Sequence, residues 1–465
     1  HEVNTRDRQR LHPSTARTRE SRARSVSRQW GGIGLLALLA LSGCARRGDG
    51  PVTLRMWAMG REGEVVGELV RDFEATHPGI RVHVQQIPWS AAHEKLLTSH
   101  VGGSLPDVGQ LGNSWIWEFG TLKAVESLDP WLAKGGIGRE QYFGGIWDTN
   151  VLDGVTYGLP WYVDTRLLFY RKDLLARAGY ASMPTDWASW KACLRAITKR
   201  GGAKHYGIFL PTNEWMQPVV LGLQSGSSLL ADGGTRGAFR SPEFRRAFDF
   251  YLSLYREGLA PTYGLQDIAN MYQELERGTF AMVITGPWNL GEFARRLPDS
   301  LQGAWSTAVM PGPDGPGVSF AGGSSLVMFK GTKHPEAAWE LMSYLSQPEQ
   351  QVRFWRLTGD LPARREAWAD SALTADERTR AFGDQLLRTA PCPMVPEWEE
   401  IATRVLEQSD RAIRGAATPD SALASLDRIV DQLLEKRRWL AERKRGGHAA
   451  KSEAGATLTA KAGNR

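Results

Sequence analysis

Hydrophobic and polar residues alternate in short stretches along this chain, and longer stretches with a helical hydrophobic period separate them. Residues 52–57 read VTLRMW and alternate as a strand does, and residues 80–85 repeat the pattern. Between them Val65, Leu69 and Phe73 recur at four-residue spacing, which predicts a helix. Strand, helix and strand within about 30 residues make a βαβ unit, which predicts a parallel sheet.

Later parts of the chain repeat the strand pattern and then turn helical. Further strands are predicted at residues 157–160, 167–170, 206–210, 280–284 and 326–329. Helices are predicted at residues 335–345, 349–357, 374–387, 397–413 and 420–440. The fold class is therefore α/β with a helical C-terminal part. Beyond residue 440 Ala, Gly, Lys and Ser dominate, a composition that predicts a disordered tail.

The net charge of +6 is concentrated at the two ends of the chain. The first 29 residues hold eight arginines against three acidic residues, and the stretch after residue 440 is basic as well. The remaining body is mildly acidic. Because a nucleic-acid-binding protein concentrates Lys and Arg on its folded part, this distribution argues against a nucleic-acid partner.

The N-terminal stretch has the pattern of an export signal. A basic arm precedes a short apolar run at residues 33–41, which ends at Leu41-Ser42-Gly43-Cys44. This ending resembles the lipobox of bacterial lipoproteins, which implies that residues 1–43 are the signal peptide and arm, that Cys44 carries a lipid, and that residues 44–51 form a tether. The alternative is a chance cysteine after a hydrophobic run. The lipobox resemblance predicts a protein anchored to a membrane in the periplasmic or extracytoplasmic cell envelope.

The other two cysteines leave a choice open. Cys193 and Cys392 could form a disulfide in an oxidising compartment, or they could be two unpaired, buried hydrophobic residues.

The sequence lacks the residue spacing of the catalytic motifs considered. His93-Glu94 is followed by His100, seven positions after His93, so the two rings cannot share a metal as they do in a zinc protease. No phosphate-binding loop of the G-x-x-x-x-G-K-S/T type occurs, and Gly322-Gly323-Ser324-Ser325 lacks the pattern of a nucleophile elbow. A secreted glycoside hydrolase remains the enzyme alternative, because 18 tryptophans and scattered carboxylates would suit a sugar cleft.

Several motifs, taken in order, resemble one family. Residues 157–175 read YGLPWYVDTRLLFYRKDLL, and PTDW at 184–187, LERGTFAMVITGPW at 275–288, PGP at 311–313, KHPEAAW at 333–339 and LPAR at 361–364 follow. The set resembles the family 1 extracellular solute-binding proteins, which include the maltose and trehalose/maltose receptors.

This resemblance implies the type II periplasmic-binding-protein fold, with two α/β lobes joined by hinge strands. The predicted lobes are residues 52–162 with 318–356 and residues 163–317 with 357–440, followed by the tail at 441–465.

The resemblance also implies a function. The chain is expected to capture a mono- or oligosaccharide between its lobes and to deliver it to the permease subunits of an ABC importer, as a monomer and without enzymatic activity, cofactor or metal. A receptor of the same fold for glycerol-phosphate-type or other polar solutes is the first alternative, and the glycoside hydrolase is the second.

A sugar offers hydroxyls at its rim and apolar C–H faces, so its receptor needs polar side chains and flat aromatic rings. The predicted ligand-binding residues are Glu62, Asn113, Tyr162, Asp164, Trp288, Gly322, Gly323 and Arg364. The family resemblance carries most of these assignments. The glycines are chosen because they let backbone approach a ligand closely.

Purely structural roles compete with these assignments. Tyr162 could be packing, Asp164 a cap, Glu62 a charge favoured at a helix start, Trp288 a core residue and Arg364 part of a solvated arginine pair.

The chain departs from its relatives at two positions. Gly112 stands where relatives often have aspartate, so Asn113 beside it is expected to replace the acid. Ser324 stands where relatives that bind disaccharides can have an aromatic residue. Other tryptophans could supply the missing stacking face, namely Trp89, Trp115, Trp161 and Trp215.

Overall fold

The computed structural model of this chain describes residues 50–443. The predicted signal peptide, basic arm, lipid attachment at Cys44 and most of the tether lie outside the described residues, as does the tail from residue 444 onward. Within the described part, no helix combines the length and the apolar character needed to cross a membrane.

The predicted βαβ unit opens the described chain. Strand β1 (Val52–Met59) is followed by helix α1 (Gly60–Thr76) and strand β2 (Ile80–Ile87). The two strands pair in parallel along their whole length, from Val52 opposite Ile80 to Met59 opposite Ile87. Val65, Leu69 and Phe73 all lie on the buried face of α1. The four-residue spacing therefore predicted both the helix and the face that packs against the sheet.

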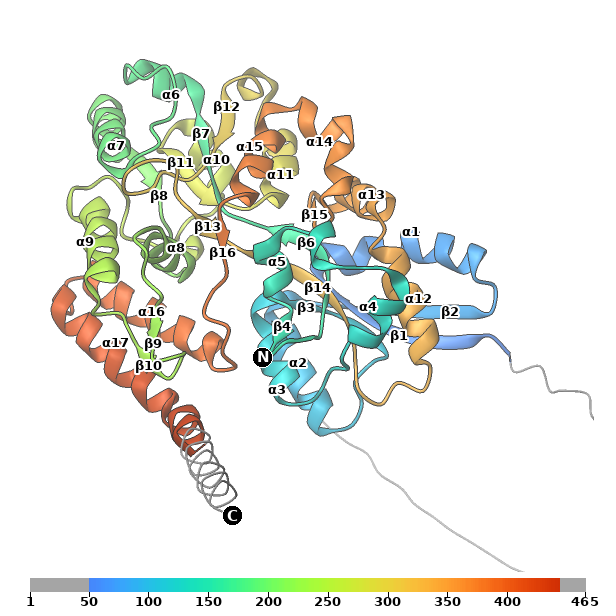
Figure 1. The fold of residues 1–465 in the computed structure, drawn as a ribbon. Helices are drawn as coiled ribbons and strands as arrows, with labels where there is room; N and C mark the ends of the chain where they lie inside the picture. The colour runs from blue at the N-terminus through green and yellow to red at the C-terminus, as the bar shows by residue number, and fades with distance from the viewer. Residues whose placement is uncertain (1–49, 444–465) are drawn as a thin grey trace, which may run out of the picture. The chain divides into compact units, whose positions relative to one another are not determined.

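The first sheet combines strands from distant parts of the chain (Figure 1). Its order is β15-β6-β14-β3-β1-β2, with β3 at Val108–Gly112, β6 at Leu159–Asp164, β14 at Gly322–Met328 and β15 at Leu361–Pro362. Strand β14 runs antiparallel to both β3 and β6. Residues 361–362, which the sequence assigned to the second lobe, pair with β6 in this first sheet. The other lobe bounds stay predictions.

The second sheet has the order β12-β7-β11-β8. Its strands are β7 (Leu167–Arg171), β8 (Tyr206–Phe209), β11 (Phe280–Thr285) and β12 (Trp305–Ala308). Helices α7 (Trp187–Gly201), α8 (Met216–Gln224), α9 (Pro242–Arg256), α16 (Trp398–Ile413) and α17 (Pro419–Leu433) share a hydrophobic core with it. Cys193 and Cys392 are buried in this core as free thiols.

The chain passes from the first sheet to the second between β6 and β7, where only Thr165 and Arg166 separate the two strands. It returns between β12 and β14, through the short strand β13 (Ser319–Phe320), which pairs with β16 (Thr389–Ala390). Residues at the end of β6 and the start of β14 therefore lie where the two sheets are joined.

The C-terminal helices agree with the prediction except at two breaks. Helices α12 (Pro335–Leu345) and α13 (Pro348–Thr358) lie at the predicted places, but the helix predicted over residues 374–387 is divided into α14 (Ser371–Ala375) and α15 (Glu377–Leu386). Asp376 interrupts it, because its carboxylate accepts a hydrogen bond from the Arg378 backbone N–H as the N-cap of α15. The helix predicted to residue 440 has a turn at Leu434, and helical structure resumes at residues 435–443, including the first three residues of the predicted tail.

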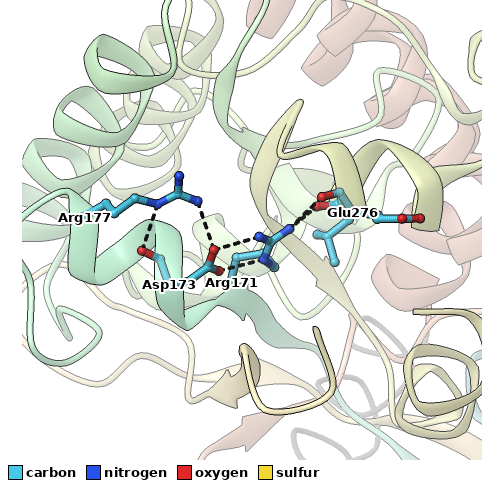
Figure 2. Close-up of polar contacts among 5 residues, drawn as sticks. Arg171, Asp173, Arg177 and Glu276 are labelled. Atoms are coloured by element: carbon cyan, nitrogen blue, oxygen red, sulfur yellow. Dashed lines mark hydrogen bonds and ion pairs between the residues drawn. The ribbon is translucent and has the colours of Figure 1, made fainter. Parts of the chain in front are cut away.

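A buried arginine ties strand β7 to helix α10 (Met271–Arg277), which precedes β11 (Figure 2). Arg171, 5% exposed, donates to the Asp173 carboxylate at 2.7 and 2.8 Å and to the backbone carbonyls of Leu275 and Glu276 at 2.8 and 2.9 Å. Arg177 donates to Asp173 from the other side, at 2.9 Å. Burial opposes ionisation of Asp173, but the two guanidinium groups outweigh it and lower its pKa. The cluster adds side-chain donors to carbonyls at the end of α10, where the Leu275 carbonyl also accepts the Gly278 backbone N–H.

Candidate functional site

A cavity of about 730 Å³ lies where the two sheets are joined. Its size is in the range of small-molecule binding sites. Seven of the eight residues predicted to contact ligand line it, and these are Glu62, Asn113, Tyr162, Asp164, Trp288, Gly322 and Gly323. The exception is Arg364.

One side of the cavity is built on a buried hydrogen-bond network around Tyr162, which is 5% exposed. The Tyr162 hydroxyl donates to Glu62 Oε1 at 2.6 Å and accepts from Ser324 Oγ at 3.1 Å. Gln110 Nε2 lies 3.1 Å from the same hydroxyl and 3.3 Å from Glu62 Oε1. Burial, followed by the nearby charges of Glu62 and Asp360, raises the pKa of Tyr162 well above its ordinary value, so the phenol stays protonated and donates.

Local structure fixes the position of Glu62. Helix α1 begins at Gly60, and Glu62 lies in its first turn with 6% of its surface exposed. The backbone N–H of Met59, the residue before the helix, donates to Gln110 Oε1 at 2.8 Å. This hydrogen bond turns the amide nitrogen of Gln110 toward Glu62. The helix start favours an acidic residue here, and the same geometry presents that acid to the cavity.

Asp164, Arg166 and Trp288 form a second group, at the crossing between the sheets. Asp164 Oδ2 lies 3.4 Å from Arg166 Nη2, and the Arg166 guanidinium lies 4.5 Å from the centre of the Trp288 ring. Burial raises the pKa of Asp164, Arg166 opposes that effect, and Glu214 adds to it. Asp164 Oδ1 and Arg166 Nε are buried without a hydrogen-bond partner among the described residues. The half-buried Trp288 opens helix α11 (Trp288–Arg296), where it contributes an aromatic surface to the cavity wall.

Asn113 lies just after strand β3, in the place where the sequence predicted an amide instead of an acid. Its Oδ1 accepts from Ser325 Oγ at 3.0 Å, while its Nδ2 has no partner among residues 50–443. The side chain is thus held by one atom and has a donor left over.

The paired glycines are needed by the sheet. Gly323 has φ +124°, and a Cβ there would lie 2.2 Å from the Tyr162 carbonyl oxygen. A Cβ on Gly322 would lie 2.9 Å from the Asp164 carbonyl oxygen. The described contacts therefore explain both glycines by the approach of β14 to β6, whereas close approach to a ligand stays a prediction.

Arg364 does not line the cavity. Its Nη1 donates to Gln141 Oε1 at 2.6 Å, and its guanidinium lies 5.1 Å from the centre of the Tyr142 ring. The predicted ligand role rested on a motif in relatives, and here the side chain is engaged by a neighbouring loop instead.

The tryptophans considered as stacking faces divide in two. Trp89, Trp115 and Trp215 line the cavity, whereas Trp161 is fully buried and stacks on Phe354 with 4.3 Å between ring centres. Ser324 is also fully buried, and its hydroxyl belongs to the hydrogen-bond network around Tyr162.

Sequence reasoning missed several lining residues. The remaining polar and charged ones are Arg61, Ser114, Arg166, Tyr272, Glu292, Thr358, Asp360, Arg296 and Glu399. Most come from helices and loops distant in sequence, and no local pattern marks them. Asp360 is the exception, because it immediately precedes the LPAR motif at residues 361–364.

The cavity is acidic overall. Its lining contains five carboxylates and three guanidinium groups. Each arginine already has an acidic partner, since Arg61 pairs with Glu64 at 3.0 Å, Arg166 with Asp164, and Arg296 with Glu292. Such a site favours neutral, hydroxyl-rich ligands over anions.

Comparison with known proteins agrees with this architecture. A profile of the family described as bacterial extracellular solute-binding protein matches residues 60–352. The solved structure of the sugar-binding protein MalE from Xanthomonas citri is 47% identical in sequence, with a TM-score of 0.81 over 84% of this chain and 99% of that one.

Curated relatives extend the match. An uncharacterised lipoprotein of Streptomyces antibioticus is 30% identical over 82% of this chain and 87% of its own. The galactooligosaccharide-binding protein of Bacillus subtilis is 24% identical over 80% and 86%, respectively. The predicted fold of two α/β lobes joined by hinge strands is confirmed, and the chain belongs to the bacterial extracellular solute-binding protein family.

Proposed function

We propose that this protein captures a carbohydrate in the cavity between its two sheets and delivers it unaltered to the permease of an ABC importer. The relatives named above include a sugar-binding protein and a galactooligosaccharide-binding protein. The observation that carries the proposal is the combination of two hydroxyl acceptors, the buried Glu62 and the partly buried Asp164, with the Trp288 ring in one cavity.

Each part of a sugar has a counterpart in this lining. Carboxylates accept hydrogen bonds from ring hydroxyls, and charge-assisted hydrogen bonds of this kind are the stronger ones. The Trp288 face offers an apolar surface to the C–H side of a sugar ring, and Trp89, Trp115 and Trp215 offer further aromatic surface at other parts of the wall.

The acidic lining favours a sugar over a glycerol phosphate. A phosphate would require cations that are free to pair with it. The three arginines of the lining are each paired with an acid, so a phosphate would have to displace those acids.

We further propose that the protein acts without chemistry on its ligand, as a monomer anchored by lipid on Cys44 at the extracytoplasmic face of a membrane. One relative is named a lipoprotein. Acylation is tested by metabolic labelling with a radioactive fatty acid, which should label the chain and should fail to label the Cys44→Ser variant.

Isothermal titration of the purified protein against a panel tests the main proposal. The panel contains glucose, galactose, maltose, trehalose, galactooligosaccharides and glycerol 3-phosphate. We expect at least one sugar to bind with a Kd on the order of 1 µM, equivalent to about −8 kcal/mol, and chromatography should recover it intact. Binding of glycerol 3-phosphate alone, or cleavage of the sugar, would refute the proposal.

A further inference from the structure

Asp360 is a buried acid in the cavity wall with no cationic partner. It is 7% exposed, lines the cavity and lies just before strand β15. The neighbouring Thr358 hydroxyl donates to the Phe354 carbonyl at 2.9 Å. The backbone N–H of Asp360 is satisfied by Thr358 Oγ1 at 3.0 Å. The carboxylate therefore faces the cavity with unused acceptor capacity.

The acids around Asp360 do not supply donors. Glu62 Oε1 already accepts the Tyr162 hydroxyl proton, at 2.6 Å, so that proton is unavailable to Asp360. Asp164 contributes negative charge from strand β6, and its nearest cation, Arg166, is engaged by it at 3.4 Å.

Arg61, a cation of the cavity lining, also has partners other than Asp360. Arg61 lines the cavity, but it pairs with Glu64 at 3.0 Å and its Nη2 lies 3.5 Å from the Leu357 carbonyl oxygen. In the part of the chain that the structure describes, no lysine, arginine or histidine forms an ion pair with Glu62 or Asp360. Two buried acids thus face one cavity without a protein cation between them.

A buried carboxylate is stable in its ionised form only when donors satisfy its oxygens. The donors of Tyr162, Thr358 and Arg61 are directed to other acceptors, whereas a sugar presents several hydroxyl donors. We propose that Asp360 is a ligand-binding residue that carries a proton in the empty protein and, once its proton has passed to solvent, accepts hydrogen bonds from ligand hydroxyls. This inference rests on the proposed function and adds to it a linkage between sugar capture and proton release.

The electrostatics of the empty cavity agree with that linkage. Burial, followed by the charges of Glu62 and Asp164, raises the pKa of Asp360 well above its ordinary value, and the Thr358 hydroxyl offsets only part of that rise. Hydrogen bonds from ligand hydroxyls favour the ionised form, so the pKa of Asp360 falls in the complex. Affinity should therefore increase with pH until the pH exceeds the raised pKa of the empty protein, and acid should weaken capture. No bond in the ligand forms or breaks.

Titration calorimetry in two buffers of different ionisation enthalpy counts the protons released on binding. The probe is maltose, or the tightest-binding sugar of the panel if maltose does not bind. The wild-type protein should release a fraction of a proton and bind more tightly as pH rises. Asp360→Asn should abolish that release and weaken binding about 10- to 100-fold. Asp314→Asn, at a side chain that is 87% exposed, is the matched control and should behave as wild type.

The outcomes separate this inference from the proposed function. If the wild-type protein binds no sugar, both are wrong. If it binds without a change in bound protons, or if a folded Asp360→Asn protein binds as tightly as wild type, the role of Asp360 is refuted and the proposed function stands. Should Asp360→Asn fail to fold, proton counting on the wild-type protein can still refute the inference, because it requires that protons are released on binding.

Discussion

Removing the Tyr162 hydroxyl is the most informative single change at the site. Tyr162→Phe keeps the ring but deletes the donor to Glu62 Oε1 and the acceptor for Ser324 Oγ. Glu62 is then left with Gln110 Nε2 at 3.3 Å as its only described side-chain partner. The Phe variant therefore loses a charge-assisted hydrogen bond without losing ring volume.

The size of the effect follows from the burial of the group. A hydrogen bond to a charged group contributes about 1.5–3 kcal/mol, and an unsatisfied buried partner adds to the cost of losing it. We expect Tyr162→Phe to reduce the free energy of unfolding by about 2–3 kcal/mol. Sugar binding should weaken about 10-fold, because Glu62 is no longer held in one orientation.

Urea unfolding followed by tryptophan fluorescence measures the stability, and isothermal titration measures the affinity. Tyr180→Phe is the matched control, because the Tyr180 hydroxyl takes part in no hydrogen bond among the described residues. Combining Tyr162→Phe with Ser324→Ala should cost less than the sum of the single changes, by about 1 kcal/mol, since the two hydroxyls are bonded to each other. A Tyr162→Phe protein with wild-type stability and affinity would refute the reasoning.

Three further changes test other parts of the account. Trp288→Ala should weaken sugar binding about 10-fold, whereas Trp288→Phe should retain part of the affinity, because the face of an aromatic ring packs against the sugar. Equal losses of affinity for both variants in isothermal titration would contradict this. Arg171→Met should lower the free energy of unfolding by about 3 kcal/mol in urea titrations without changing the affinity for sugar. It removes the four hydrogen bonds of Arg171 and leaves Asp173 paired with Arg177 alone. An unchanged urea midpoint would count against it. The pKa of His93 is raised mainly by its hydrogen bond to Glu118, which is 2.6 Å long. Relative to His93→Gln, the wild type should therefore be stabilised fully below a pH of about 6.5, and this stabilisation should be lost as pH rises through the raised pKa. A stability difference that stays the same from about pH 5 to 9 would refute this prediction.

Local patterns were sufficient for most of the fold. The alternation at residues 52–57 and the four-residue spacing of Val65, Leu69 and Phe73 both reflect which side chains are buried. In the strand these are the side chains that face the core, and in the helix they are those that face the sheet. The break at Asp376 was missed because the residue that caps α15 lies inside an otherwise continuous helical pattern.

The site was predictable where a strand end or helix start fixes a residue. Glu62 and Trp288 lie in the first turn of a helix and Tyr162 lies near the end of strand β6, and all three line the cavity. Arg364 and Asp360 were not predictable in this way. The direction of each side chain depends on contacts from other segments, with the loop at Gln141 engaging Arg364, whereas Asp360 comes to lie beside Glu62 only once helix α1 and strand β15 are packed on the same sheet.

A crystal structure of the protein with its tightest-binding sugar would show where and how the ligand is held. We expect an intact sugar in the cavity, with its hydroxyls hydrogen-bonded to Glu62 and Asp164 and its ring against the Trp288 face. Electron density for the sugar outside this cavity, or for a cleaved product within it, would refute the proposed function.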